Sequence, residues 1–487
     1  MKQLNLLLAN VRAIEIHNNH NAEVVSLTYD SRSVERGALF FAVRGTQSDG
    51  HNYIASAIER GATAIVCEQL PQQLNDAVCY VVVEDSNIAM AHIASTFYDN
   101  PSKELRLVGV TGTNGKTTTA TLLYDMFMAM GYKAGLISTV IYRIGQRSIA
   151  STHTTPDAIR LNQMMRQMVD EGCDYCFMEV SSHAAAQHRI EGLHFTGALF
   201  TNLTHDHLDY HGTYKEYINA KKSFFDRLDK GAWAVVNGDD RNGEVMLQNC
   251  KAKGYRLSLR SMADYRTKIV EMHPDGMLLL IDGQELWVKF TGRFNAYNLT
   301  TVYAAATLLG IDKLEVLTTL SQLTPVAGRF ETIVADDQTM AIVDYAHTPD
   351  ALENVLQTIE EVRQDQQRLI VVCGCGGDRD KTKRPEMAAI ATKYATTAFF
   401  TSDNPRTESA EAILDDMVQG VEGAKNWLRI TDRREAIRTA TMLAQPKDII
   451  LVAGKGHEDY QIIGTEKHHF DDREEVRNAF NQTHNNR

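Results

Sequence analysis

The chain lacks a hydrophobic run long enough to cross a membrane. Of its 487 residues, 44% are apolar. The longest apolar runs have only the length of a β-strand, whereas a membrane-spanning helix needs about 20 consecutive apolar residues. The first residues, Met1 to Leu8, form too short an apolar stretch for a secretion signal, and no small-residue cleavage site follows. These absences predict a cytoplasmic protein without membrane insertion.

An excess of positive charge is also absent. The chain has 50 Lys and Arg against 62 Asp and Glu, which gives a formal net charge of −12. Sequence-independent binding of nucleic acid needs a basic surface, so this balance argues against a nucleic-acid partner. Anionic small substrates are not excluded, because a few local Lys and Arg side chains can hold them.

The chain has seven cysteines, and few of them are spaced as metal ligands are. Cys173-x-x-Cys176 and Cys373-x-Cys375 could suggest a metal or redox site, but no second pair at zinc spacing accompanies either of them. Cys173 precedes an apolar strand that Cys176 begins, and Cys373 ends another strand. Buried apolar thiols are therefore the favoured interpretation.

The length of the chain and the order of its apolar segments predict three α/β domains. Residues 1–101 form a small α/β unit, with strands expected at residues 38–43 and 62–66. Residues 102–332 alternate strands and helices, which favours a mostly parallel sheet covered on both faces. Residues 333–487 contain four short apolar strands that each end in polar residues, which is typical of a Rossmann-like, doubly wound domain.

The segment from Val110 to Thr118 is the most informative part of the sequence. It follows an apolar strand and opens a helical pattern, as a phosphate-binding loop does. Backbone N–H groups of such a loop point at phosphates, Lys116 bridges them, and Thr117 can hold Mg²⁺. The general motif has Gly where this chain has Val110, so a glycine-rich turn that merely starts a helix is the alternative. The candidate nucleotide-binding residues here are Gly112, Thr113, Asn114, Gly115, Lys116, Thr117 and Thr118.

A second cluster of polar residues closes the strand that ends near Glu179. In a phosphate-loop protein, an acidic residue at the end of a neighbouring strand is the expected Mg²⁺ partner. Ser181, Gln187 and Arg189 follow, and such groups can hold a phosphate or a sugar. A helix-capping cluster without further function is the alternative.

Residues 201–212 contain three His and two Asp within seven positions. Zinc, magnesium and a plain hydrogen-bonding network are equally open from the residue types, because a single His on Mg²⁺ is unusual on grounds of ligand hardness. Lys221 and Lys222 follow on a predicted helix. Taken alone, two adjacent lysines on a helix indicate a solvated face.

Three polar loops in the last domain are expected to meet at one edge of its sheet. They are residues 376–381, 403–406 and 454–458, and each follows an apolar strand. Arg379 and Arg406 can grip carboxylates through two hydrogen bonds each, and Glu458 can take an ammonium. Such a pocket suits a zwitterionic amino acid that carries an extra carboxylate.

Together these motifs resemble the Mur ligase family over essentially the whole chain, and a chance match of the ordered set is negligible. The motifs that carry the resemblance are Asp30-Ser31-Arg32, Gly45-x4-Gly50-His51, Gly112 to Thr118, Thr154-Thr155-Pro156, Glu179 to His183, His207 to Gly212, Asn295-x-x-Asn298, Gly328 to Glu331, Asp344 to Thr348 and Asp403 to Arg406.

The resemblance implies a monomeric, ATP-dependent ligase of peptidoglycan synthesis with Mg²⁺ as cofactor. In this family ATP phosphorylates the carboxylate of UDP-MurNAc-L-Ala-D-Glu, an amine attacks the acyl phosphate, and phosphate leaves the tetrahedral intermediate. Lys116 and Mg²⁺ would stabilise the charge that builds up on the transferring oxygens. The metal positions implied by the resemblance are Thr117, Glu179, His207 and Lys221, the last as a carbamoylated lysine that binds a second Mg²⁺.

The resemblance also assigns positions to the substrates. The residues that match UDP-MurNAc positions are Ser31, Thr154, Thr155, Ser181, Gln187 and Arg189. The residues that match nucleotide positions are Asn298, Arg329, Asp344 and His347. The residues expected around the added amino acid are Arg379, Asp403, Asn404, Pro405, Arg406, Gly454 and Glu458.

The amino acid that the motif at residues 403–406 implies is meso-diaminopimelate. L-Lysine lacks the distal carboxylate that Arg379 and Arg406 would face, and like charges at about 4 Å repel by about 1–4 kcal/mol. An L-lysine-adding ligase is the alternative. Residues 30–32 and 403–406 argue against a D-alanyl-D-alanine-adding ligase and a folylpolyglutamate synthetase. A regulatory ATPase is a further alternative, but it would not need a metal-binding lysine at position 221.

Overall fold

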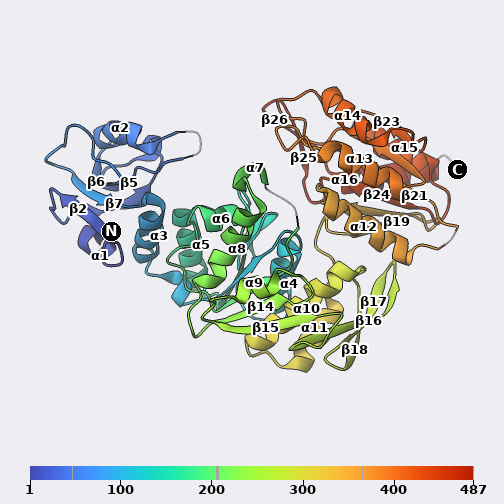
Figure 1. Ribbon diagram of the computed structural model, residues 1–487, viewed down its shortest axis with the longest axis horizontal. Coiled ribbons are helices and arrows are strands. Elements are labelled where there is room, and N and C mark those ends of the chain that lie inside the picture. The colour runs from blue at the N-terminus through green and yellow to red at the C-terminus, as the bar shows by residue number, and fades with distance from the viewer. Residues whose placement is uncertain (46–47, 205–207, 365, 486–487) are drawn as a thin grey trace.

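The computed structural model describes residues 1–45, 48–204, 208–364 and 366–485. Three α/β domains follow one another along its longest axis, with the N-terminus in the first and the C-terminus at the far end of the third (Figure 1). No helix in the described part of the chain is both long and apolar enough to span a bilayer.

The N-terminal domain has a five-stranded sheet in the order β2-β7-β6-β5-β4, in which only β2 runs antiparallel to its neighbour. The two expected strands are confirmed as β5 and β6, and α2 lies between them in the sequence. The strands are β1 (Lys2–Gln3), β2 (Ala13–His17), β3 (Glu23–Val24), β4 (Ser26–Thr28), β5 (Ala38–Phe41), β6 (Ala62–Cys67) and β7 (Cys79–Val83). The helices are α1 (Leu4–Leu7), α2 (Ile54–Glu59) and α3 (Ser86–Phe97).

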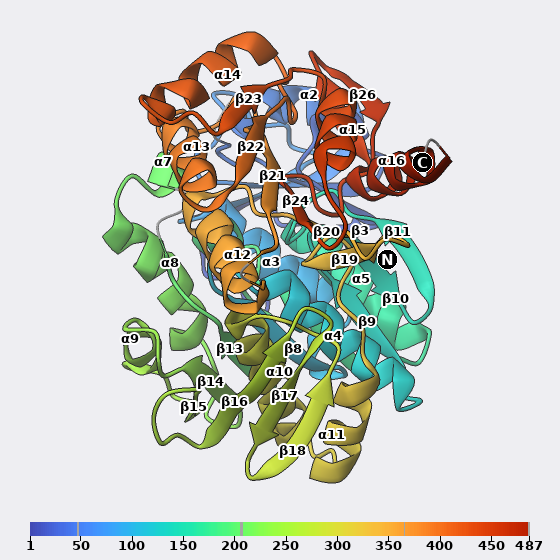
Figure 2. The same ribbon diagram turned by 90° about the vertical axis from the view of Figure 1, so that its right-hand side faces the viewer.

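The central domain is built on an eleven-stranded sheet whose middle is parallel, as the alternating pattern predicts. Its order is β11-β10-β9-β12-β8-β13-β14-β15-β16-β17-β18. The strands are β8 (Arg106–Thr111), β9 (Ala134–Ile137), β10 (Ile141–Ile144), β11 (Arg147–Ala150), β12 (Tyr175–Glu179), β13 (Gly197–Phe200), β14 (Trp233–Asn237), β15 (Lys253–Ser258), β16 (Tyr265–His273), β17 (Gly276–Ile281) and β18 (Gln284–Val288). Antiparallel hairpins extend both edges (Figure 2), and the sequence analysis did not predict them.

Helices cover both faces of the central sheet. Apolar side chains of α4, α10 and α11 form the core on one face, and those of α5, α8 and α9 form it on the other. The helices are α4 (Lys116–Ala129), α5 (Ala158–Asp170), α6 (Ser182–Ala186), α7 (Leu208–His211), α8 (Tyr214–Asp226), α9 (Gly243–Leu247), α10 (Arg293–Leu308) and α11 (Lys313–Gln322).

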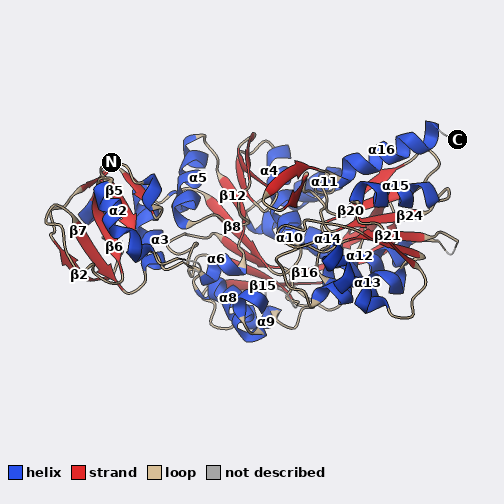
Figure 3. Ribbon diagram, turned by 90° about the horizontal axis from the view of Figure 1, so that it is seen from above, coloured by secondary structure: helices blue, strands red, loops and turns tan. Residues whose placement is uncertain are grey.

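The third domain is doubly wound, with sheet order β19-β20-β24-β21-β22-β23. All four predicted strands are present. Helices α12 to α14 cover one face of the sheet, and α15 and α16 cover the other (Figure 3). The strands are β19 (Glu331–Val334), β20 (Met340–Asp344), β21 (Leu369–Cys373), β22 (Thr397–Phe400), β23 (Trp427–Arg429), β24 (Ile449–Ala453), β25 (Tyr460–Ile463) and β26 (Glu466–His469). The helices are α12 (Pro349–Val362), α13 (Lys383–Tyr394), α14 (Ala410–Val418), α15 (Arg433–Leu443) and α16 (Asp472–Asn485).

The cysteines of both closely spaced pairs are buried, as expected for apolar thiols in and around strands. Cys173 precedes β12 and Cys176 lies within it, while Cys373 ends β21 and Cys375 follows. Burial raises the pKa of each of these thiols. A neutral, buried thiol is a poor nucleophile and a poor metal ligand.

Candidate functional site

A cleft of about 1180 Å³ runs between the central and third domains. Loops that are far apart in sequence meet in it, because the phosphate loop and the carboxyl ends of β20, β21, β22 and β24 face one another. The predicted site residues that line the cleft are Thr113, Asn114, Gly115, Lys116, Thr117, Thr154, Thr155, Glu179, Ser181, Arg189, Lys221, Arg329, His347, Arg379, Asp403, Asn404, Arg406, Gly454 and Glu458.

The other predicted site residues lie outside the lining of this cleft. Two of them belong to the phosphate loop and the helix after it, Gly112 and Thr118. Asn298 lies in α10, Asp344 ends β20, and Pro405 lies in the loop after β22. The side-chain oxygen of Gln187 accepts hydrogen bonds from Arg189, which lines the cleft. Ser31 belongs to the first domain, in the short 3-10 turn Ser31–Ser33. His207 lies outside the described residues.

The phosphate loop depends on two glycines at positions where a side chain does not fit. Gly115 has φ +88°, and a Cβ there would lie 2.5 Å from Asn298 Oδ1. Gly112 has φ +148°, and a Cβ there would lie 1.9 Å from Thr201 Oγ1. The Thr201 hydroxyl also donates to the carbonyl of Asn114 at 2.6 Å. The loop is thus held against the segment that follows β13, with its backbone N–H groups at the start of α4.

Lys116 lies over the loop that carries it. Its Nζ donates to the carbonyl oxygens of Gly112 at 2.9 Å and Thr113 at 2.7 Å. The next residue, Thr117, accepts a hydrogen bond from Arg329 Nη2 at 3.2 Å. An ammonium, a hydroxyl and a guanidinium therefore converge where a phosphate loop holds phosphates.

Glu179 ends β12, the parallel neighbour of the phosphate-loop strand β8, and its side chain is buried. Its carboxylate accepts hydrogen bonds from the backbone N–H of Thr139 at 2.7 Å and from the Thr139 hydroxyl at 3.2 Å. Thr154 accepts from the same hydroxyl at 3.0 Å. A carboxylate so oriented in the cleft beside a phosphate loop is suited to a hard cation such as Mg²⁺.

The solvated face that two adjacent lysines indicate when taken alone does not apply to Lys221, which lies in the cleft where the resemblance implied it. The side chain of Lys221 is 1% exposed, and its Nζ donates to the Gly112 carbonyl at 2.8 Å. It also lies 4.7 Å from the centre of the Tyr217 ring. Lys222 points elsewhere, toward Asp226 and the carbonyl of Gln248. Helix α8 packs with the Lys221 side against the phosphate loop, so only this lysine reaches the cleft.

A hydrogen-bonded network extends the cleft toward the first domain. Arg189 donates to the carbonyl of Thr155 at 2.7 Å and to Gln187 Oε1 at 2.6 Å and 3.0 Å. Ser181 caps α6 and lies 3.4 Å from the Thr155 hydroxyl. Tyr29 of the first domain is near enough to Arg189 for the guanidinium to oppose the rise in the tyrosine pKa that burial and Asp157 cause. The sequence did not indicate Tyr29.

The three polar loops of the third domain meet as predicted, because β24, β21 and β22 are adjacent parallel strands. Asn404 Nδ2 donates to Glu458 Oε2 at 2.8 Å, which joins the loop after β22 to the loop after β24. Arg406 Nη1 donates to the carbonyl of Gly377 at 2.7 Å, which joins it to the loop after β21. Arg379 lines the same cleft.

Lys455 is a functional candidate that the sequence did not reveal. It is fully buried, and its Nζ lies 3.0 Å from Glu458 Oε2. The expectation that Glu458 is available to an ammonium therefore needs modification, because its carboxylate already meets an internal cation. Burial and Asp403 raise the pKa of Glu458, and Lys455 opposes that rise. The only sequence signal was a lysine between two glycines directly after a buried strand.

The predicted nucleotide-side residues of the third domain gather around Arg329. Asp344 ends β20, and its carboxylate accepts from the backbone N–H of Phe330 at 2.7 Å. Burial raises the pKa of Asp344 to about 6, although Arg329 opposes the rise. The Arg329 guanidinium lies 4.6 Å from the centre of the Tyr345 ring, and His347 Nδ1 lies 2.8 Å from the Tyr345 carbonyl.

Asp350, in the first turn of α12, joins the third domain to the phosphate loop. Its Oδ2 accepts from Asn114 Nδ2 at 3.0 Å and from the Thr204 hydroxyl at 3.1 Å. The sequence did not indicate this residue, because an acidic residue in the first turn of a helix is explained by helix capping alone.

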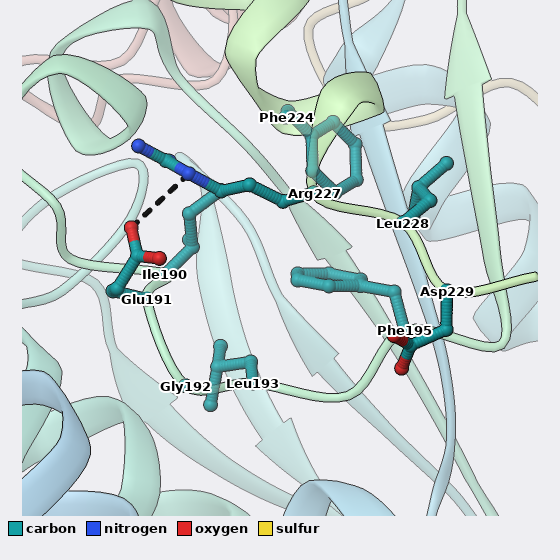
Figure 4. Close-up of a pocket in the computed structure, with 9 residues that line it drawn as sticks. All are labelled: Ile190, Glu191, Gly192, Leu193, Phe195, Phe224, Arg227, Leu228 and Asp229. Atoms are coloured by element: carbon teal, nitrogen blue, oxygen red, sulfur yellow. Dashed lines mark ion pairs between the residues drawn. The ribbon is translucent and has the colours of Figure 1, made fainter. Parts of the chain in front are cut away.

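A second pocket lies behind α8, outside the cleft (Figure 4). It has a volume of about 80 Å³ and lies beside an ion pair in which Arg227 Nε and Glu191 Oε2 are 3.1 Å apart. Phe195 and Phe224 form part of its wall. It is far too small for a nucleotide, since ligand sites typically occupy about 300–1,000 Å³.

Comparisons with known proteins agree with this geometry. Residues 110–306 match the family model for the Mur ligase middle domain. Residues 328–456 match the model for the Mur ligase glutamate ligase domain, and residues 23–98 match the model for the Mur ligase family catalytic domain. The three matched regions each contain part of the cleft or of the network that leads to it.

Two similar proteins from different organisms carry the same name. A UDP-N-acetylmuramoyl-L-alanyl-D-glutamate--2,6-diaminopimelate ligase of Bacteroides fragilis is 53% identical over 483 residues, which is 99% of this chain and 100% of the relative. The ligase of the same name from Parabacteroides distasonis is 55% identical over 462 residues, covering 94% and 95% of the two chains.

Solved structures of similar proteins extend the match to the fold. A structure of a ligase with that name aligns with a TM-score of 0.69 and 33% identity, over 95% of each chain. A MurF ligase from Thermotoga maritima in complex with ADP shares the fold, with a TM-score of 0.62 and 16% identity over 95% of this chain and 98% of that one. On the family models and the full-length relatives together, the chain belongs to the Mur ligase family.

Proposed function

We infer that this chain is an ATP-dependent ligase of peptidoglycan synthesis that joins meso-diaminopimelate to UDP-MurNAc-L-Ala-D-Glu. Relatives 52–55% identical over nearly the whole chain carry the name of this activity. The observation that carries the inference is the shared cleft. It brings a phosphate loop and an arginine-containing pocket together, so that a phosphoryl donor and an amino acid can meet.

In the proposed reaction the γ-phosphoryl group of ATP passes to the D-glutamate side-chain carboxylate. The amine of diaminopimelate attacks the resulting acyl phosphate, and phosphate leaves with the bonding electron pair. Lys116 and Arg329 stabilise negative charge on the transferring oxygens, because both lie at the mouth of the phosphate loop. The nucleotide side of the site comprises Gly112, Thr113, Asn114, Gly115, Lys116, Thr117, Thr118, Asn298, Arg329, Asp344 and His347.

The proposed cofactor is Mg²⁺, with the Thr117 hydroxyl, the Glu179 carboxylate and His207 as ligands and a carbamate on Lys221 as the ligand of a second Mg²⁺. The Glu179 carboxylate and the Thr117 hydroxyl line one cleft and are hard oxygen ligands, so they fit this ion. Mg²⁺ would neutralise charge on the phosphoryl oxygens. Lys221, rather than Lys222, is the proposed site of carbamoylation because only its Nζ reaches the phosphate loop.

The remaining residues are assigned to the other two substrates. Proposed contacts with UDP-MurNAc come from Ser31, Thr154, Thr155, Ser181, Gln187 and Arg189. Proposed contacts with the added amino acid come from Arg379, Asp403, Asn404, Pro405, Arg406, Gly454 and Glu458. The proposed domains are residues 1–101, 102–332 and 333–487, and we propose that the protein works as a cytoplasmic monomer.

An ADP-release assay tests the proposal. ADP should form at a sustained rate only when ATP, UDP-MurNAc-L-Ala-D-Glu and meso-diaminopimelate are all present. L-Lysine should be a poor substitute, because it would bring an ammonium to two guanidiniums without the carboxylate that neutralises them. Absence of ATP consumption with the complete set would refute the ligase assignment. Equal turnover with L-lysine would refute only the choice of amino acid.

A further inference from the structure

His457 lies in the loop after β24, one residue before Glu458, and lines the cleft. Its ring is 4.8 Å from that of Tyr345. Its Nδ1 is buried and has no hydrogen-bond partner among the described residues. A buried polar atom costs free energy unless a partner satisfies it, so an unpartnered acceptor on a residue that lines the substrate cleft indicates a partner on the substrate.

The backbone around His457 is held in place by a close approach of two loops. A Cβ at Gly328 would lie 2.0 Å from the backbone nitrogen of His457, and one at Gly456 would lie 2.5 Å from the Gly328 carbonyl oxygen. Both glycines have positive φ, +65° and +52°. No other residue type fits this contact without moving the chain. The imidazole is therefore positioned by the fold, as a group that acts on a substrate must be.

This position is the junction between the two halves of the site. On one side, Glu458 and Lys455 belong to the amino-acid pocket, in the same loop as His457. On the other side, Arg329 follows Gly328 and donates to Thr117 of the phosphate loop. His457 therefore lies next to both the proposed amino-acid pocket and the residues that contact the phosphate loop.

The surroundings keep His457 neutral. Burial lowers its pKa to about 3, reinforced by Arg329, Arg473 of α16, His347 and Lys455. At neutral pH the ring is therefore uncharged, and with its proton on Nε2 the Nδ1 atom is an acceptor. An anionic phosphate group bound beside Arg329 would offset this cation and make the imidazole more basic when the substrates are present.

We propose that His457 accepts the proton that the attacking amine loses during amide formation, an inference that rests on the proposed ligase function. The neutral amine forms the C–N bond with the acyl carbon, and its nitrogen passes one proton to Nδ1. The C–O bond to phosphate then breaks, and phosphate takes the electron pair. The imidazolium returns its proton to the departing phosphate or to solvent.

The test separates the two half-reactions in His457→Asn. Asparagine places an amide near the position of Nδ1, so it can form hydrogen bonds but cannot take a proton. We expect kcat for amide formation to fall by about 10²–10⁴-fold, the usual contribution of general base catalysis. Acyl phosphate formation needs no proton acceptor, so acyl phosphate trapped by borohydride reduction should not decrease. His468→Asn, on the exposed hairpin strand β26, is the matched control and should behave as the unmodified enzyme.

Three results would overturn the proposal. They are wild-type kcat in His457→Asn, a change confined to KM for diaminopimelate, and a parallel loss of acyl phosphate and amide. Equal thermal unfolding of the two variants would exclude misfolding as the cause of a loss. If the unmodified enzyme itself formed neither acyl phosphate nor amide, the ligase function would fail first and this inference with it.

Discussion

Lys221 and Lys222 are neighbours in the sequence, yet their side chains have different partners and point away from one another. Lys221 is buried against the phosphate loop, and Lys222 pairs with Asp226 at the edge of α8. A helix turns by about 100° per residue, so adjacent side chains on one helix cannot both face the same neighbour.

The first prediction concerns this pair. Lys221→Ala should reduce ligation by about 10²-fold or more, because it removes the carbamate that would hold Mg²⁺ beside the phosphates. Lys222→Ala should leave activity near that of the unmodified enzyme, since a partly exposed ion pair contributes about 1 kcal/mol or less to stability. The ADP-release assay measures both. Added acetate should restore part of the activity of Lys221→Ala by supplying a carboxylate, and a fully active Lys221→Ala would contradict the carbamate.

Asp344 gives the second prediction, a dependence of stability on pH. Its pKa is 3.8 in the unfolded chain and about 6 in the fold. Between these values the folded state binds more protons, so its stability falls as pH rises. Above about pH 6 the ionised carboxylate costs the fold about 3 kcal/mol, at about 1.4 kcal/mol for each pKa unit.

Asp344→Asn removes this ionisation and leaves an oxygen to accept from the Phe330 N–H. Denaturant titrations near pH 4 and pH 7 should therefore show the variant gaining stability relative to the unmodified protein, by up to about 3 kcal/mol, as pH rises. The difference between the two proteins cancels the other titrating groups, including His457. A difference that does not change with pH would contradict the raised pKa.

At the scale of elements, the third domain shows how a parallel sheet assembles a site from distant segments. The loops after β21, β22 and β24 are separated by long helical connections, but their strands are adjacent, so the loops meet at one edge. The pattern of strands was sufficient to predict this meeting. The hydrogen bonds between the loops, such as the one from Asn404 to Glu458, were not predictable from the pattern.

The third prediction tests the loop after β22. Arg406→Ala should raise KM for meso-diaminopimelate by about 10- to 150-fold, because a hydrogen bond to a charged group contributes about 1.5–3 kcal/mol. L-Lysine has no distal carboxylate for Arg406 to bind. The kcat/KM for L-lysine should therefore fall less than that for meso-diaminopimelate, or rise. Arg438→Ala, an exposed arginine of α15 that pairs with Glu435, serves as the control. Equal loss with both amino acids would show that Arg406 does not select between them.

At the scale of the whole molecule, polar side-chain contacts join the third domain to the phosphate loop and the segment beside it. Asp350 accepts hydrogen bonds from Asn114 and Thr204, and Arg329, at the end of the central domain just before the third, donates to Thr117. Domain closure around substrates commonly uses a small number of such polar contacts, because they can break without loss of a domain core.

The fourth prediction is that Asp350→Ala loosens this arrangement. Without substrates, small-angle X-ray scattering should give a larger radius of gyration than for the unmodified protein, because hydrogen bonds to a carboxylate each contribute about 1.5–3 kcal/mol. Glu360→Ala lies on the same helix and loses a pair with Arg363 of the same domain, so it should leave the scattering unchanged. An unchanged radius in both variants would show that other contacts hold the domains together.

The sequence by itself determined the phosphate loop, the three α/β units and the meeting of the three loops, because these depend on local residue order and on the regular geometry of parallel strands. The tertiary structure alone decided that Lys221 is buried while Lys222 is not, that Lys455 neutralises Glu458, that Asp350 reaches Asn114, and that His457 faces the cleft. Each of these outcomes depends on which distant element packs against the residue. Burial and the partners it supplies are properties of that packing, and no local pattern encodes them.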